Sequence, residues 1–311
     1  MAHPRLPMAV VAAEEDAGAA VAVEDRVGIG WRGMLAASVF ANLDRIDLIE
    51  IIADDHFDAS SKTLRALRTL SDQIPITLHG VTMGLASMFP VDIRRAENMA
   101  RLVNTLEPES WSEHLAFVRA GGAEIGHLAA PPRTRQSMDA TVANIEQVSK
   151  IVGTVPQIEN IATLIYPPAS MLDEATWVSG IVDGSGCRLL LDLHNLHANA
   201  LNFGDAPEDL LLRFPLHKVS MIHISGGQWA AEPGGDRPPR MRLVDDHLHD
   251  PPPIVYSLLT MVAAHATQPL SVILERDGDY PHFGALLNQL DTARLALQQG
   301  RDIAAQTSEA A

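Results

Sequence analysis

The sequence predicts an α/β fold, a (βα)8 barrel, because eight short apolar runs alternate with amphipathic helical patterns along 311 residues. Several of the runs are apolar throughout, as is typical of parallel strands covered on both faces. Hydrophobic residues make up 47% of the chain, enough for a large core. No segment resembles an interdomain linker. We therefore expect one barrel domain over 27–300, with a flexible leader at 1–26 and a flexible tail at 301–311.

The β-branched, apolar runs define the strands in order. They are VGIGW (27–31), IDLIEIIA (46–53), PITLHG (75–80), SEHLAF (112–117), VPQIEN (155–160), CRLLLDLHN (187–195), VSMIHISG (219–226) and LSVILERD (270–277). Helical periodicity follows each strand, over 34–43, 61–72, 92–107, 137–152, 170–182, 207–214 and 254–265, and again after Pro281. The Pro- and Gly-rich stretch 226–240 is expected to be a loop after the seventh strand, either a lid or an idle surface insertion.

Histidines and acidic residues cluster at the predicted strand ends. In a (βα)8 barrel the C-terminal ends of the strands meet at one mouth, where active sites lie. A single histidine is more commonly a packed or surface residue. Here many such side chains are expected to converge on that mouth: His79, His114, Glu159, Asp192, Asn195, His223 and Glu275, with Asp245, His247 and His249 from the loop after the seventh strand.

The charges of this set indicate bound cations. Two carboxylates about 4 Å apart repel by roughly 4 kcal/mol at an effective dielectric of 20. The mouth would hold four, on Glu159, Asp192, Asp245 and Glu275, and two divalent ions would balance them. Mixed nitrogen and oxygen ligands suit iron, manganese or zinc better than magnesium. The D-x-H-x-H spacing would put Asp245, His247 and His249 on one face of an extended segment.

Composition excludes several other functions. The net charge of −16 disfavours nucleic acid and anionic membranes as partners. The single cysteine, Cys187, excludes an internal disulfide and a cysteine-based zinc site, and its place at the start of a strand predicts a packing residue far from the mouth. No signal peptide or membrane span is evident, so we expect a cytoplasmic protein.

One motif favours a different fold. Gly28, Gly30 and Gly33 have the G-x-G-x-x-G spacing of a dinucleotide site, with Glu50 about 20 residues later. A buried strand should precede Gly28, but the residues there are the charged run 24–26. We therefore assign these glycines to the first barrel strand.

Eight segments together resemble a known family, the multinuclear non-heme iron-dependent oxidative enzymes, which include the methanobactin biosynthesis oxidase. The segments are GIGWR (28–32), LHGVTMGLAS (78–87), SEHLAF (112–117), IEN (158–160), LLLDLHN (189–195), IHISG (222–226), VDDHLH (244–249) and LERD (274–277). The resemblance covers about 27–281 and implies a TIM barrel of the xylose-isomerase-like group.

The resemblance also implies a chemistry. All ten residues at the mouth match the family's metal positions, with two or three iron ions in a mixed Fe(II)/Fe(III) state and Glu159 as the bridging candidate. The implied reaction is oxidation by O2 of a residue, often cysteine, in a ribosomally synthesised precursor peptide. Glu159, Asp245 and His249 would be catalytic, and a small partner protein would recruit the peptide's leader.

The chain departs from the family in places. At 50–56 it reads EIIADDH, where many members have E-x-H-x-E-N, so Asp54, Asp55 and His56 are either a variant cluster or a helix-capping turn. His194 and His197 replace the usual Asn and aromatic residue. Two other hypotheses remain: an endonuclease IV-like or sugar-isomerase-like metalloenzyme that does not use O2, and a non-catalytic metal-binding barrel.

Overall fold

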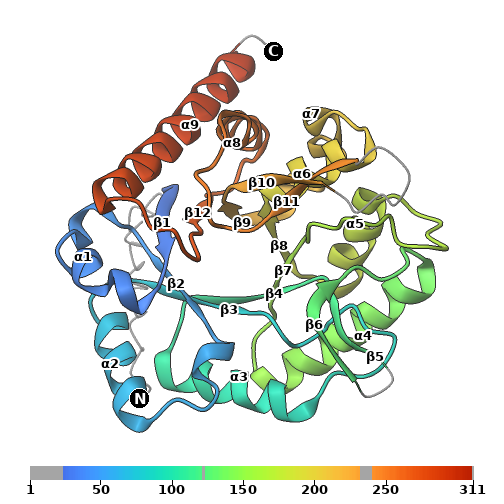
Figure 1. Ribbon diagram of the computed structural model, residues 1–311, viewed down its shortest axis with the longest axis horizontal. Coiled ribbons are helices and arrows are strands. Elements are labelled where there is room, and N and C mark those ends of the chain that lie inside the picture. The colour runs from blue at the N-terminus through green and yellow to red at the C-terminus, as the bar shows by residue number, and fades with distance from the viewer. Residues whose placement is uncertain (1–23, 121–122, 232–239, 310–311) are drawn as a thin grey trace, which may run out of the picture.

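In the computed structural model, eight parallel strands form a closed barrel with helices outside it (Figure 1). The structure describes residues 24–120, 123–231 and 240–309. The barrel strands are β1 (Arg26–Gly30), β2 (Ile49–Ile52), β3 (Ile76–Gly80), β4 (Ser110–His114), β7 (Gln157–Glu159), β8 (Arg188–Asp192), β9 (Val219–Ile224) and β12 (Ser271–Leu274). They pair in the order β1-β12-β9-β8-β7-β4-β3-β2, and β1 closes the ring by pairing with both β12 and β2. The predicted fold and all eight strands are confirmed, which rules out the dinucleotide-binding alternative.

A helix follows each barrel strand. The α-helices are α1 (Ala36–Phe40), α2 (Ser61–Ser71), α3 (Ile93–Leu106), α4 (Arg135–Val152), α5 (Glu174–Ser185), α6 (Leu193–Phe203), α7 (Pro207–Leu211), α8 (Pro253–His265) and α9 (Phe283–Glu309). Short 3-10 helices cover Gly33–Leu35, Leu43–Arg45, Asp54–His56 and Leu216–Lys218. Side-chain caps explain several helix starts, for example Asp92 on α3 and Asp173 on α5. None of the helices in the described ranges has the length and apolar character needed to cross a membrane.

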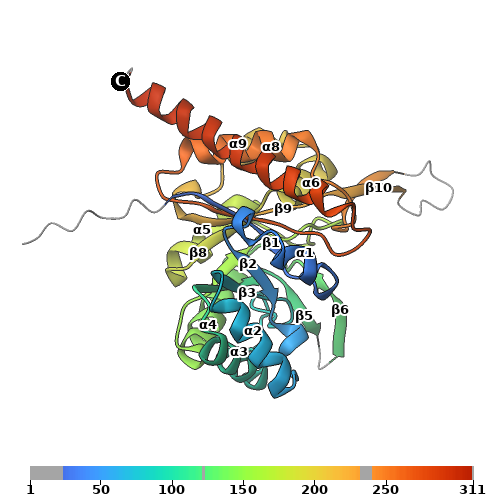
Figure 2. The same cartoon turned by 90° about the vertical axis from the view of Figure 1, so that its left-hand side faces the viewer.

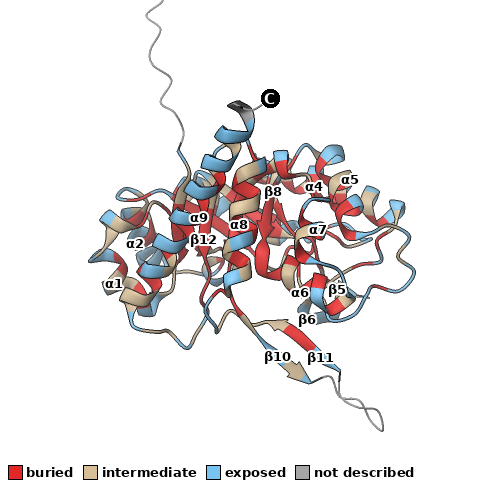
Figure 3. Ribbon diagram, turned by 90° about the horizontal axis from the view of Figure 1, so that it is seen from above, coloured by how far each residue is buried: buried red, intermediate tan, exposed pale blue. Residues whose placement is uncertain are grey.

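Two antiparallel hairpins extend from the C-terminal end of the barrel (Figure 2). One pairs β5 (Phe117–Ala120) with β6 (Ala123–Ala129); beyond Phe117, the end of the predicted fourth strand, the sequence predicted no element here. The other pairs β10 (Gly227–Ala231) with β11 (Met241–Asp245) and projects from the body of the molecule (Figure 3). Residues 226–240, expected to be a loop, therefore contain the first strand of a hairpin. The part at 232–239 lies outside the described residues.

The barrel interior has an apolar layer directly below the polar mouth. Its members are Leu48, Leu190, Met221 and Ile273, which form a cluster separate from the core between strands and helices. Side chains two residues apart on a strand point the same way. Each of these residues is followed two positions later by a polar one, so the alternation places Glu50, Asp192, His223 and Glu275 in the layer above.

The chain ends differ from the expected boundaries. Residues 1–23 of the expected leader lie outside the described residues, while Arg26 already belongs to β1. The expected tail at 301–311 is helical as far as Glu309, because α9 continues through it. Arg301 holds this helix to the barrel: its guanidinium donates to both carboxylate oxygens of Asp25 and to the carbonyl oxygen of Gln268.

Candidate metal centre

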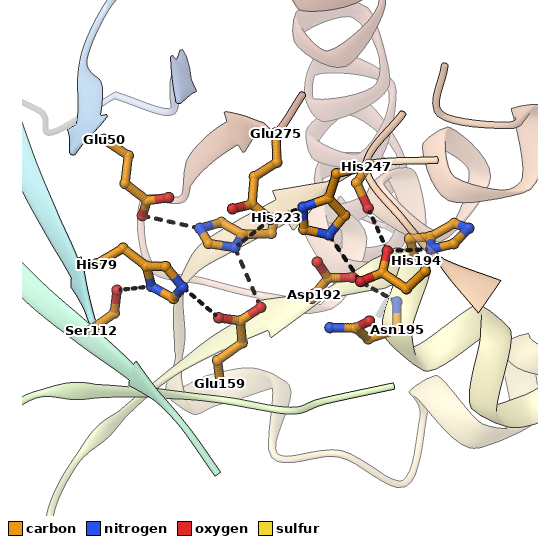
Figure 4. A network of polar contacts seen from close by, with 12 residues as sticks. Glu50, His79, Ser112, Glu159, Asp192, His194, Asn195, His223, His247 and Glu275 are labelled. Atoms are coloured by element: carbon orange, nitrogen blue, oxygen red, sulfur yellow. Dashed lines mark hydrogen bonds and ion pairs between the residues drawn. The ribbon is translucent and has the colours of Figure 1, made fainter. Parts of the chain in front are cut away.

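Seven side chains form three groups of converging ligand atoms at the mouth. Six of them lie on barrel strands, and the seventh, Glu275, directly follows β12. Within each group the ligand atoms lie within 4.8 Å of one another: Glu50, His79 and His223; His79, His114 and Glu159; Glu159, Asp192, His223 and Glu275. His79, Glu159 and His223 each belong to two groups, so the three groups are continuous (Figure 4). Six of the seven are almost fully buried, and the His114 side chain is 11% exposed.

Glu159 lies between two of these groups, and its two oxygens face different histidines. Oε2 lies 3.4 Å from Nε2 of His79 and 3.4 Å from Nε2 of His114. Oε1 lies 3.4 Å from Nδ1 of His223. A carboxylate in this position can bind two cations at once.

Hydrogen bonds to the outer ring nitrogens orient two of the histidines. Nδ1 of His79 lies 2.8 Å from the Ser112 hydroxyl, and Nδ1 of His114 lies 3.1 Å from the carbonyl oxygen of Gly80. The Gly80 carbonyl can only accept, so His114 carries a proton on Nδ1 and its Nε2 faces Glu159. Metal-binding histidines commonly have this arrangement.

His223 has a carboxylate at each ring nitrogen. Its Nε2 lies 3.0 Å from Oε2 of Glu50, and its Nδ1 lies 3.1 Å from Oε2 of Glu275. Although burial lowers the pKa of His223, the charges of Glu275, Glu50 and Glu159 raise it well above its ordinary value. The centre therefore strongly favours an added positive charge.

Asp192 shows how the local fold supplies a ligand atom. It ends β8 and is the N-cap of α6, where its Oδ1 accepts from the backbone N–H of Asn195 at 2.6 Å. Its Oδ2 is buried without a hydrogen-bond partner. Burial, followed by the charges of Asp245, Glu159 and Glu275, raises the pKa of this carboxyl well above its ordinary value. The spacing of Asp192 and Asn195 thus reflects a capped helix start at the edge of the centre.

Asp245 and His247 extend the network from β11 and the turn after it. Asp245 Oδ1 lies 2.9 Å from Nδ1 of His194, and its Oδ2 lies 2.9 Å from Nε2 of His247. Burial raises the pKa of Asp245, but its contacts with these two histidines lower it to about 2. His247 also approaches Glu275, with Nδ1 3.6 Å from Oε2. Both residues therefore adjoin the three groups.

His249 does not join them. His247 has a left-handed backbone, with φ of 54°, which ends the extended alternation on which the prediction of a common face for Asp245, His247 and His249 depended. The His249 side chain is 46% exposed, and its Nδ1 lies 2.9 Å from Oδ1 of Asp246. For His249 the predicted common face is wrong.

The variant segment 54–56 forms a 3-10 helix outside the three groups. Asp54 accepts hydrogen bonds from the backbone N–H of Val81, at 2.8 Å, and from the Thr82 hydroxyl. The Asp54 side chain therefore stabilises the loop that follows β3. Cys187 is buried beside the start of β8, at the opposite end of that strand from Asp192.

The sequence analysis did not predict Glu50 as a site residue and assigned His194 no contact at the mouth. The glycine motif links Glu50 to a dinucleotide site, whereas its spacing from Leu48, which matches that of Asp192 from Leu190, places it at the mouth. His194 is fully buried on α6 beneath the hairpin base, where Gly227 leaves room for its ring: a Cβ on Gly227 would lie 2.6 Å from Cε1 of His194.

The unpaired atoms of the centre fit a metal cluster. A buried polar atom without a hydrogen-bond partner destabilises the folded state unless a bound ion interacts with it. Here they concentrate on facing side chains: Glu50 Oε1, Glu159 Oε2, Asp192 Oδ2, His194 Nε2, Asn195 Oδ1, His223 Nδ1 and His247 Nε2. The donor set of imidazole nitrogens and carboxylate oxygens suits a first-row transition metal.

Comparison with known structures supports the fold. The structure is similar to L-ribulose 3-epimerase, with a TM-score of 0.55 and 15% identity over 92% of this chain and 97% of that one. It is also similar to a xylose isomerase domain protein from Planctomyces limnophilus, with a TM-score of 0.54 and 13% identity over 91% and 99%. At these identities the likeness establishes a xylose-isomerase-like TIM barrel.

Comparison of sequences establishes the family. The chain is 32% identical to a UPF0276 protein of Streptomyces avermitilis over 88% of its length, which spans 55% of that relative. It is 31% identical to a UPF0276 protein of Caulobacter vibrioides, covering 81% of this chain and 88% of the relative. Residues 26–298 match the family described as RiPP precursor modification enzyme MbnB/TglH/ChrH, where RiPP denotes a ribosomally synthesised, modified peptide. The chain therefore belongs to this family of peptide-modifying enzymes.

Proposed function

We propose that this protein is a multinuclear iron enzyme that uses O2 to oxidise a residue of a ribosomally synthesised precursor peptide. Cysteine is the first residue to test, followed by aspartate or another C-terminal residue. The observation that carries the proposal is the sharing of His79, Glu159 and His223 among three buried groups of ligand atoms. Such sharing favours two or three adjacent ions over one isolated ion.

The chain's own residues would have distinct tasks in this proposal. The metal ligands would be Glu50, His79, His114, Glu159, Asp192, His223 and Glu275, with Asp245 and His247 beside them and Asn195 offering its buried amide oxygen. Glu159 would bridge two ions. Bound iron would transfer electrons from the peptide residue, which is oxidised, to O2, which is reduced. The Ser112 hydroxyl and the Gly80 carbonyl would keep the rings of His79 and His114 directed at the ions.

The test combines metal analysis with peptide oxidation. Protein purified without oxygen should contain more than one iron per chain and little zinc. After incubation with a short peptide encoded beside its gene, mass spectrometry should show a change in peptide mass under O2 and none under nitrogen. A small partner protein encoded nearby should be added in a parallel reaction, because leader recruitment is part of the proposal.

One outcome would favour the alternative class. Full activity on a sugar or on DNA with zinc alone, in the absence of O2, would make the protein an isomerase-like or endonuclease IV-like metalloenzyme. The net charge of −16 argues against the DNA substrate.

A further inference from the structure

Arg32 and Asp277 form an ion pair at the mouth where the barrel closes. They are 245 residues apart, but each follows one of two paired strands, β1 and β12. Nε of Arg32 donates to Oδ1 of Asp277 at 3.0 Å, and Nη2 donates to the same oxygen. Nη1 donates to the carbonyl oxygen of Trp31 at 2.8 Å. The guanidinium is therefore held from two sides and fixes one oxygen of the Asp277 carboxylate.

The other carboxylate oxygen of Asp277 faces His247. Oδ2 lies 3.3 Å from Nδ1 of the imidazole. The backbone N–H of Asp277 also donates to the carbonyl oxygen of His247 at 2.9 Å. Asp277 thus contacts both the ring and the backbone of the same residue.

His247 needs such support, because it adopts a backbone conformation that residues with a Cβ seldom adopt. Its φ is 54°, in the left-handed region, and its N–H donates to the Gly226 carbonyl at 3.1 Å. Strained backbone of this kind persists only where the surroundings hold it, and it is frequent at functional sites. Asp277 and Gly226 supply backbone contacts on either side of the strained residue.

The contacts of the ring indicate its tautomer. Asp277 can hold the proton of His247 on Nδ1, which leaves the Nε2 lone pair directed at Asp245 Oδ2, 2.9 Å away. Nε2 has no hydrogen-bond partner. A lone pair and a carboxylate oxygen at this distance repel, so the contact requires either a proton between the two atoms or a metal cation beside them.

We propose that Asp277 and Arg32 are positioning residues that fix the ring and tautomer of His247 for metal binding. This inference rests on the proposed function. Asp277 belongs to none of the three ligand groups found among the described residues, its side chain is 45% exposed, and one of its oxygens is occupied by Arg32. It therefore acts on a metal ion through His247.

The test measures Fe(II) affinity without oxygen, by competition with a chromophoric chelator, for four proteins. These are the wild type, Asp277→Ala, His247→Ala and the double variant. Disruption of an outer partner of a metal-binding histidine typically weakens metal affinity by about 10–100-fold. We expect a loss of that size for one iron equivalent in Asp277→Ala. In the His247→Ala background the same change should add no further loss, because its effect passes through that ring.

Two further variants keep the test decisive. Arg32→Gln breaks the same pair from the other side and should weaken the same iron equivalent, even if Asp277→Ala folds poorly. Asp291→Ala is the matched control, because Asp291 pairs with Arg45 and Arg294 on the surface and contacts no histidine in the described residues. It should bind iron as the wild type does.

The outcomes separate the two proposals. A wild type that binds no iron overturns both. A wild type that binds several iron equivalents, with Asp277→Ala and Arg32→Gln unchanged, overturns only the positioning role. Equal losses from Asp277→Ala in both backgrounds also overturn it, because that result indicates a general structural effect.

Discussion

Replacement of Glu159 by glutamine is the sharpest test of the candidate centre. The substitution keeps the shape of the side chain and removes its charge, and an uncharged amide is a much poorer metal ligand than a carboxylate. Glu159 is 1% exposed, so water cannot readily compensate for the lost charge. Both of its oxygens face ligand nitrogens of neighbouring histidines. The variant therefore alters two of the three groups at once.

The distances set the scale of the effect. We take the 3.4 Å between Glu159 and the His114 nitrogen as the scale of the separation between the Glu159 charge and a bound cation; a unit charge at that distance contributes about 5 kcal/mol at an effective dielectric of 20. The amide oxygen would still offer a weak ligand, so we take about half of this value as the loss. Since about 1.4 kcal/mol corresponds to a tenfold change in affinity, iron binding should weaken by about 100-fold. Peptide turnover should fall by at least 10–100-fold.

The assay measures iron content and O2-dependent peptide oxidation on the same preparation. Glu113→Gln is a matched control from the adjacent strand. Glu113 is also 1% exposed, but its carboxylate accepts backbone N–H groups, from Met83 at 3.2 Å and from His114 at 3.0 Å. Its Oε1 lies 3.8 Å from Nδ1 of His114, the ring nitrogen that does not face Glu159. The control should retain its iron. After metal removal, Glu159→Gln should melt close to the wild type, because it loses attraction to histidines and repulsion from Asp192 together.

Near wild-type iron content and turnover in Glu159→Gln would refute this reasoning. Such a result would mean that Glu159 does not touch a metal ion, and the proposed bridging role would have to be abandoned. An equal loss of iron in Glu113→Gln would point instead to a general sensitivity of the mouth to buried charge.

Three further predictions follow from single contacts. His249→Ala should keep most of its iron, because that side chain is half exposed and bonds to Asp246; loss of an iron equivalent on elemental analysis would contradict this. Burial raises the pKa of Cys187 to about 11, so iodoacetamide at pH 8 should label it only after unfolding, as mass spectrometry can follow. Asp173→Ala should lower the free energy of unfolding at pH 7 by about 1 kcal/mol through loss of the α5 cap. Burial opposes ionisation of Asp173, but hydrogen bonds from Thr176 lower its pKa overall. The stabilisation by this carboxylate is therefore present above the unfolded-state pKa and lost as pH falls through the lower folded-state value. Urea unfolding of the wild type and the variant at pH 7 and pH 3 should show their difference in free energy of unfolding shrinking at the lower pH.

The barrel and the strand-borne part of the centre could be predicted because strands have a fixed period of two. Once a strand such as 187–195 is recognised, Leu190 and Asp192 must share the inner face, and the closed barrel brings the ends of all strands to one mouth. The same rule applied to Leu48 predicts that Glu50 points inward. The glycine motif at 28–33 points instead to a dinucleotide role for Glu50, and that motif hides the alternation.

The parts carried by hairpins and turns could not be predicted in the same way. Asn202 of α6 holds β11 in place: its side-chain amide donates to the carbonyl oxygen of Leu243, and its side-chain oxygen accepts from the Leu243 N–H. No local sequence pattern encodes these contacts. These contacts bring Asp245 against His194, and no sequence spacing predicts that pair.

The contrast between His247 and His249 shows which side-chain directions a sequence period cannot predict. Both follow Asp245 at even spacing, and an extended segment would have placed both on its face. The left-handed φ of His247 breaks that relation, and this conformation is held by Gly226 on one side and Asp277, from a strand end in the last barrel unit, on the other. The backbone of this turn is therefore determined by residues that meet only when the barrel closes. A periodic rule can predict which residues of a strand face the metal centre, whereas the direction of a side chain in such a turn depends on its tertiary contacts.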